Sequence, residues 1–168
     1  EETQQMKWLK KLAKLSRKKK QRPSELWREI VERTDEIYVI AERFEPIFRQ
    51  AVAALLRECS MDTATALSIG NLKDPIRCHE KALDDYEGRF EDNELAESCL
   101  PDVIRFRALT EESKSIEQIQ KKLLEGFQCE VDGHIAKLEL IRVKNKFRDL
   151  DPTHFRNILN NVRLHYQG

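Results

Sequence analysis

The spacing of apolar residues changes near residue 103 of this chain, and the change limits the folds that it can adopt. From Ser24 almost to residue 59, apolar residues recur at steps of three and four, which is the spacing of one helix face. In the run 158–166, Val162, Leu164 and Tyr166 alternate with polar residues, as in a half-buried strand. Helices followed by strands predict an α+β protein.

Local signals place the individual elements. Residues 6–15 have helical spacing, and Pro46 is expected either to kink the long helix or to start a new one. Residues 60–71 indicate a helix end and a loop. A further helix is expected to begin at an N-cap, Ser113 or Ser115, and to end near Gly126. Strands are predicted at residues 103–109, 135–143 and 158–166.

We expect these elements to form two regions. Residues 1–50 are predicted to be a helical extension that contains a basic linker at residues 17–23. The linker is expected to be solvated, and nucleic-acid binding is not expected because no aromatic residue or glycine lies among its charges. Residues 51–168 are predicted to form one domain, an α/β-like mixed β-sheet flanked by helices.

Composition excludes several classes of protein. Lysine plus arginine and aspartate plus glutamate both number 30, so no overall field attracts nucleic acid or an anionic membrane. No apolar run approaches the ~20 residues that span a bilayer, and no signal-peptide pattern occurs.

The four cysteines form no C-x-x-C pair, so reduced thiols in an intracellular compartment, cytoplasmic or organellar, are expected rather than a zinc site. Because the first residue is Glu1, we expect a processed chain or part of a longer protein.

Several charged residues are candidates for a binding site. Lys73, Arg77 and Lys81 stand four apart, so on a helix they would form one cationic row. Such a row needs nearby acids or a bound polyanion, although an ordinary solvated helix is the alternative. If the predicted strands share one sheet, a second group of charges would gather at their ends: Asp102, Arg107, Lys144 and Arg156. A carboxylate among cations suits a metal–nucleotide site, and a solvated rim is the alternative.

The order of these residues resembles the RelA/SpoT-type nucleotidyltransferase domain over roughly residues 55–166. Members of that family transfer pyrophosphate from ATP to a guanine nucleotide. The family has an R-x-K-x-x-x-S-x-x-x-K helix that binds ATP phosphates, and this chain retains both lysines but has other residues at the arginine and serine positions: Asn71, Lys73, Arg77 and Lys81. The family strand D-x-x-G-x-R retains Asp102 and Arg107, with Arg105 in place of the glycine.

Two later motifs complete the resemblance. The run Arg142–Phe147, which includes Lys144, resembles the R-x-K-N-(K/R)-F sequence of a divergent branch of the family. Asn145 stands where the family has an aspartate. Phe155 takes the place of the tyrosine that stacks on the acceptor base in G-Y-R-S-L-H, and Arg156 matches the arginine beside it.

The resemblance implies a nucleotide site. Asp102 would be the catalytic, Mg²⁺-binding carboxylate, with Mg²⁺ as cofactor if nucleotide binding is retained. ATP, GTP or GDP would be contacted by the following residues: Lys73, Arg77, Lys81, Arg107, Lys144, Asn145, Phe155 and Arg156.

The family's second carboxylate lies in an E-x-Q motif on a C-terminal strand, and this sequence, which ends at Gly168, does not contain that motif. With Asn145 neutral as well, we expect a pseudoenzyme. Such a domain would be a structural or interaction module of a larger assembly with residual nucleotide binding, and its N-terminal amphipathic helices would dock protein partners. The alternative is an active pyrophosphokinase whose full-length form supplies the glutamate.

Overall fold

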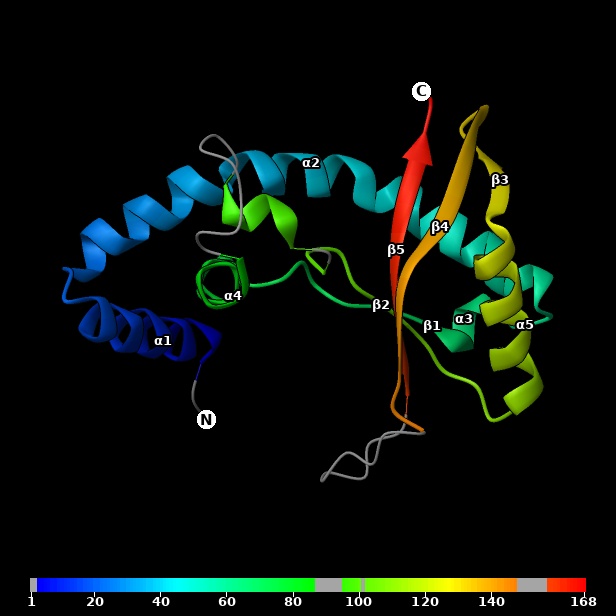
Figure 1. The fold of residues 1–168 in the computed structure, drawn as a ribbon, viewed down its shortest axis with the longest axis horizontal. Coiled ribbons are helices and arrows are strands. Elements are labelled where there is room, and N and C mark those ends of the chain that lie inside the picture. The colour runs from blue at the N-terminus through cyan, green and yellow to red at the C-terminus, as the bar shows by residue number, and fades with distance from the viewer. Residues whose placement is uncertain (1–2, 87–94, 101, 148–156) are drawn as a thin grey trace. The chain divides into compact units, whose positions relative to one another are not determined.

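The computed structural model describes residues 3–86, 95–100, 102–147 and 157–168, and it confirms the α+β class (Figure 1). The chain divides into two compact units. The first comprises residues 1–43 and 72–103, and the second comprises residues 44–71 and 104–168. This division differs from the boundary predicted near residue 50, because residues 72–103 belong with the N-terminal helices rather than with the strands.

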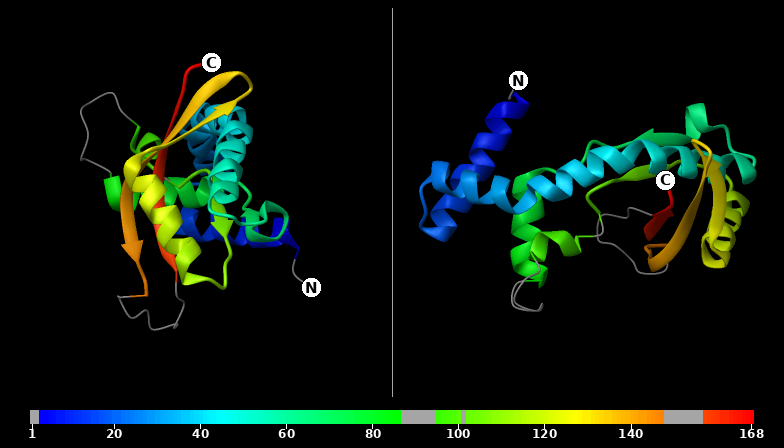
Figure 2. Two further views of the ribbon diagram at one scale, coloured as in Figure 1. Left: turned by 90° about the vertical axis from the view of Figure 1, so that its right-hand side faces the viewer. Right: turned by 90° about the horizontal axis from the view of Figure 1, so that it is seen from above.

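In the first unit, helix α1 (Gln4–Lys19) packs against the first half of helix α2 (Pro23–Glu58) and against α4 (Pro75–Tyr86) (Figure 2). The core of this unit contains four of the apolar residues that recur at helical spacing together with one residue of α4: Leu12, Leu15, Leu26, Ile30 and Ile76. Trp8 and Trp27 meet edge to face at its border, with 4.8 Å between their ring centroids. A short 3₁₀ helix, η1 (Ala96–Cys99), packs against α4.

The basic run 17–23 forms the end of α1, a short turn and the first residue of α2. Its first residues form the last turn of α1, where cations interact favourably with the negative end of the helix dipole. Lys20 adopts a left-handed conformation with φ of 55°, and Pro23 begins α2. Pro46 lies inside α2, so it does not start a new helix.

The second unit contains the later part of α2, α3 (Thr63–Ala66), α5 (Ser113–Glu125) and all the described strands. Strands β3 (Phe127–Val131), β4 (His134–Asn145) and β5 (Ile158–Tyr166) form one antiparallel sheet, in that order. Its inner face packs on α2 and α5 through a shared apolar cluster: Ala51, Leu55, Cys59, Leu123, Phe127, Val131, Ala136 and Leu138.

The remaining strands form a separate antiparallel pair, β1 (Leu67–Ile69) with β2 (Phe106–Ala108). The prediction of one mixed sheet was therefore wrong, because every pairing in the described part of the chain is antiparallel and β2 does not join β4 and β5. The predicted strand 103–109 is also shortened, since β2 begins only at Phe106, whose ring stacks on Phe48.

Strands β4 and β5 and the C-terminal end of α5 agree with the sequence prediction. Gly126, with φ of 81°, ends α5 as expected, although the residue before the helix is Glu112 rather than one of the two predicted serines. Strand β3 was not predicted. Asp132 and Gly133, both with positive φ, form the two-residue turn that joins β3 to β4.

Candidate functional site

The candidate site residues lie in different units. Lys73, Arg77, Lys81 and Asp102 belong to the first unit, and Arg107, Lys144 and Asn145 belong to the second. Phe155 and Arg156 lie outside the described residues. Each group is therefore described within its own unit.

Two of the candidate lysines bind the candidate metal ligand directly. The Lys73 Nζ atom lies 2.8 and 2.7 Å from the two carboxylate oxygens of Asp102, and the Lys81 Nζ atom lies 3.2 Å from Oδ2. A backbone hydrogen bond of 3.0 Å from the Lys73 amide to the Val103 carbonyl holds the two segments together. We call these three side chains, Lys73, Lys81 and Asp102, the lysine–aspartate cluster.

The lysine–aspartate cluster is partly shielded from water. The side chain of Lys73 is only 11% exposed, whereas Asp102 and Lys81 are about one-third exposed. Burial alone would raise the pKa of the Asp102 carboxyl, but the hydrogen bond and charge of Lys73, and then those of Lys81, outweigh it and hold that pKa below its usual value. Asp102 is therefore a carboxylate with each oxygen bonded to an ammonium group.

Arg77 does not join the lysine–aspartate cluster. Helix α4 begins at Pro75, so Lys73 precedes the helix and the predicted three-residue row on one helix is wrong. The Arg77 side chain is 60% exposed and pairs with Glu80 at 2.7 Å. Two acids of the chain itself, Asp102 and Glu80, pair with the three cations.

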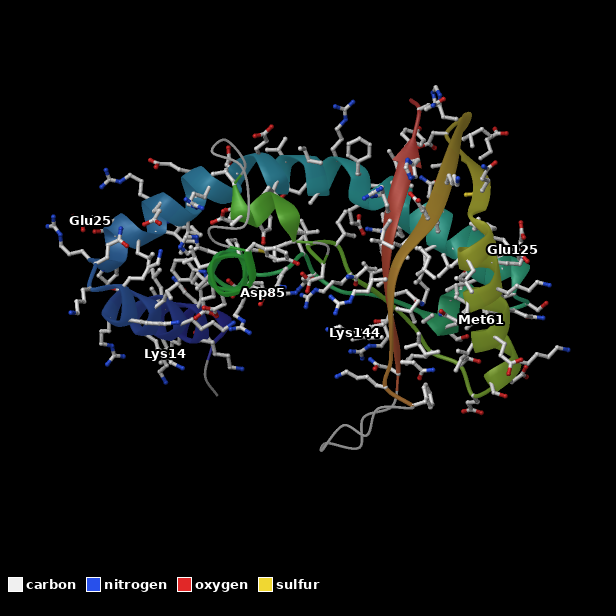
Figure 3. All side chains as sticks on the ribbon, viewed as in Figure 1. Lys14, Glu25, Met61, Asp85, Glu125 and Lys144 are labelled. Carbon is white, nitrogen blue, oxygen red and sulfur yellow. The ribbon has the colours of Figure 1, made fainter. Side chains whose placement is uncertain are left out.

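In the second unit, the candidates lie at exposed positions of two different sheets. Arg107 is on β2, whereas Lys144 and Asn145 end β4, so the predicted gathering of Arg107 and Lys144 at the strand ends of one sheet is wrong. Figure 3 shows Lys144 on its strand. The Asn145 Oδ1 atom accepts a hydrogen bond of 3.0 Å from the Phe147 amide, so this side chain caps the turn after β4.

None of the protein-family models, curated proteins or solved structures searched matches this chain. No helix within the described ranges is long and apolar enough to cross a membrane. The RelA/SpoT resemblance consequently remains a prediction from motif residues.

The residues described do not fit Mg²⁺ in this arrangement. Mg²⁺ prefers several oxygen ligands in octahedral geometry, and both Asp102 oxygens are bonded to lysine. Among the described residues, no group of three or more histidine, cysteine, aspartate or glutamate side chains is placed to hold a metal ion.

The structure also contains a buried charged network that the sequence did not reveal. Glu97 and His79 are both fully buried, and Glu97 Oε1 lies 2.8 Å from His79 Nδ1. Arg33 donates to both Glu97 oxygens, at 2.7 and 3.0 Å. On the other side of the ring, His79 Nε2 lies 2.9 Å from Lys19 Nζ, which also binds Glu29. The network joins α1, α2, α4 and η1, and the spacing of its residues along the chain carried no signal.

Glu97 makes the first unit sensitive to acid. Burial would raise the pKa of Glu97, but its bonds to His79 and Arg33 outweigh burial and lower the pKa to about 2. Because the folded pKa lies below the unfolded value, this group stabilises the fold fully above about pH 4.5, and the contribution is lost as pH falls toward 2. The lowering of the Glu97 pKa from 4.5 to about 2 corresponds to a contribution of about 3 kcal/mol to the free energy of unfolding.

We expect the free energy of unfolding to fall over that pH range in the wild type and to fall less in Glu97→Gln, which cannot titrate at this position. Urea unfolding followed by circular dichroism at pH 6, 4 and 3 measures both. An equal fall in the two proteins would show that Glu97 does not cause the acid sensitivity.

Proposed function

We propose that this chain is a RelA/SpoT-like domain that does not transfer pyrophosphate and serves as an interaction module, with weak binding of nucleotide phosphates at Lys73 and Lys81. One observation carries the proposal, the pairing of both lysines with Asp102. Three free thiols among the described residues, Cys59, Cys78 and Cys129, support an intracellular setting.

The lysine–aspartate cluster supports phosphate binding because its two ammonium groups converge on one point. Lysine binds phosphate as a point charge and needs no metal to do so. The Asp102 carboxylate already occupies that point, so a phosphate group has to displace it. Binding is therefore expected to be weak in the wild type.

The same geometry argues against catalysis. Pyrophosphate transfer needs metal ions that neutralise developing charge, and Asp102 is the carboxylate that the family resemblance assigns to the metal. In this chain Asp102 instead neutralises the lysines, and Asn145, which stands where the family has a further aspartate, caps a turn. The cluster supplies electrostatic attraction for phosphate without a place for the metal.

If Asp102 competes with phosphate, its removal should strengthen binding. We expect Asp102→Asn to bind ATP about three- to tenfold more tightly than the wild type in the absence of Mg²⁺, since two partly exposed ion pairs contribute about 1 kcal/mol. The measurement is the rise in Tm of the full chain with increasing ATP. When the measurement is repeated with Mg²⁺, an active pyrophosphokinase predicts the opposite, because loss of its metal ligand would weaken Mg²⁺-dependent ATP binding.

Two further variants locate the binding. The double variant Lys73→Ala/Lys81→Ala should lose the ATP-dependent shift, whereas Arg77→Ala, which removes a cation of α4 outside the cluster, should retain it. A shift that survives in the double variant, or one that Asp102→Asn reduces, would contradict phosphate binding at the lysine–aspartate cluster. GDP and GTP in place of ATP test whether the base matters.

A further inference from the structure

The outer face of α1 is basic and carries exposed apolar residues. Helix α1 has no aspartate or glutamate, and its lysines and arginine lie mainly on the side opposite Leu12 and Leu15. Lys11 pairs with Asp74, but Lys7 and Lys14 are exposed with no ion pair to any described residue. Figure 3 labels Lys14 on this outer face. Met6 and Leu9, each 50% exposed, border the same charges.

The outer face of the first half of α2 has the opposite charge. Four acids lie on it, all exposed and without an ion pair to any described residue: Glu32, Asp35, Glu36 and Glu42. Asp35 and Glu36 follow Glu32 by three and four residues, and Glu42 follows Asp35 by seven, so all four lie on one side of the helix. Val39, which is 59% exposed, lies among them, and Val31 and Ile40 lie at the borders. Two arginines, Arg28 and Arg43, also lie on this side.

Each face repels itself and complements the other. Like charges on one helix side destabilise it by a few tenths of a kcal/mol per pair, so each face gains from a partner of opposite sign. A chain with 30 basic and 30 acidic residues has no overall field that favours a polyanion. A nucleic acid or an anionic membrane would cover only α1 and would leave the acidic face of α2 without a partner.

We propose that the outer face of α1 in one copy binds the outer face of the first half of α2 in a second copy of this chain. The two helices pack against each other through Leu12, Leu15, Leu26 and Ile30, so their outer faces point away from each other. The contact is therefore heterologous, and each copy offers one basic and one acidic face to its neighbours. The inference rests on the interaction-module half of the proposed function and names its partner.

The test is sedimentation velocity of the full chain over a range of concentrations at low and high salt. We expect concentration-dependent association at about 0.05 M salt that weakens at least about tenfold at about 0.5 M, because the charges that hold it are exposed. Lys7→Glu/Lys14→Glu and, separately, Glu32→Lys/Glu36→Lys should each be monomeric. Mixing the two variants should restore association, since each then offers the face that the other needs.

A matched control changes the same net charge elsewhere. Lys114→Glu/Lys121→Glu alters exposed lysines of α5 and should associate like the wild type.

A wild-type protein that stays monomeric at low salt, or α1 and α2 variants that associate normally, would overturn the inference. A wild-type monomer whose α1 variant loses affinity for anionic vesicles or RNA would show that α1 binds a polyanion instead. ATP-dependent shifts in Tm are a separate measurement, so failure of self-association leaves the phosphate-binding result standing.

Discussion

Replacing Glu97 with alanine is expected to destabilise the first unit by about 3–5 kcal/mol at neutral pH, the usual cost of removing one partner of a buried ion pair. Glu97 is fully buried and binds two groups, the guanidinium of Arg33 and the ring of His79. Its loss leaves Arg33 without its bidentate partner and the buried His79 Nδ1 without a hydrogen bond. Such a loss is a large fraction of the total stability of a small domain.

Urea unfolding at pH 7 measures this effect, with Glu80→Ala as the matched control. Glu80 also pairs with an arginine, Arg77, but that arginine is exposed. Glu80→Ala should therefore lower the free energy of unfolding by less than about 1 kcal/mol. Equal effects of the two substitutions would mean that the buried network does not hold α4 and η1 to the N-terminal helices.

The second large effect is expected in the second unit, where Leu138→Ala should cost about 2–5 kcal/mol. Leu138 is 1% exposed and packs in the cluster that joins the inner face of β4 to α2 and α5. Truncation leaves a cavity between a sheet and two helices that cannot close without breaking strand pairing.

Ile135 is the control, because it lies on the same strand and is 57% exposed. Ile135→Ala should change the free energy of unfolding by less than about 1 kcal/mol. If Ile135→Ala were as costly as Leu138→Ala, the sheet would have to bury the face that β4 exposes at Ile135.

Local patterns predicted much of the fold. The helical spacing of α2, the glycine that ends α5 and the alternation in β5 are properties of neighbouring residues, so the sequence contains them directly. Strand β3 was missed because Phe127 continues the apolar spacing of α5, although the Asp132–Gly133 turn is a hairpin signal. Strand β1 is too short to show a period.

The candidate site was predicted less completely, because its contacts join distant residues. The sequence identified Lys73, Lys81 and Asp102 but not that they bind one another, across 29 and 21 residues of chain. His79 and Glu97 had no distinguishing spacing, and only tertiary packing makes their burial visible. Arg107, which lies in the second unit, was grouped with Asp102 because the predicted strands were assumed to share one sheet. The structure does not contain that sheet.

The most direct test of the central claim, that Asp102 neutralises Lys73 and Lys81 rather than serving a metal, is an assay for pyrophosphate transfer. The purified chain is incubated with ATP, Mg²⁺ and GDP or GTP, and products are separated by anion exchange. We expect no pyrophosphorylated nucleotide from the wild type or from Asp102→Ala, since each lost transition-state stabiliser typically costs about 10² to 10³-fold in rate. Product above background that Asp102→Ala abolishes would contradict the account.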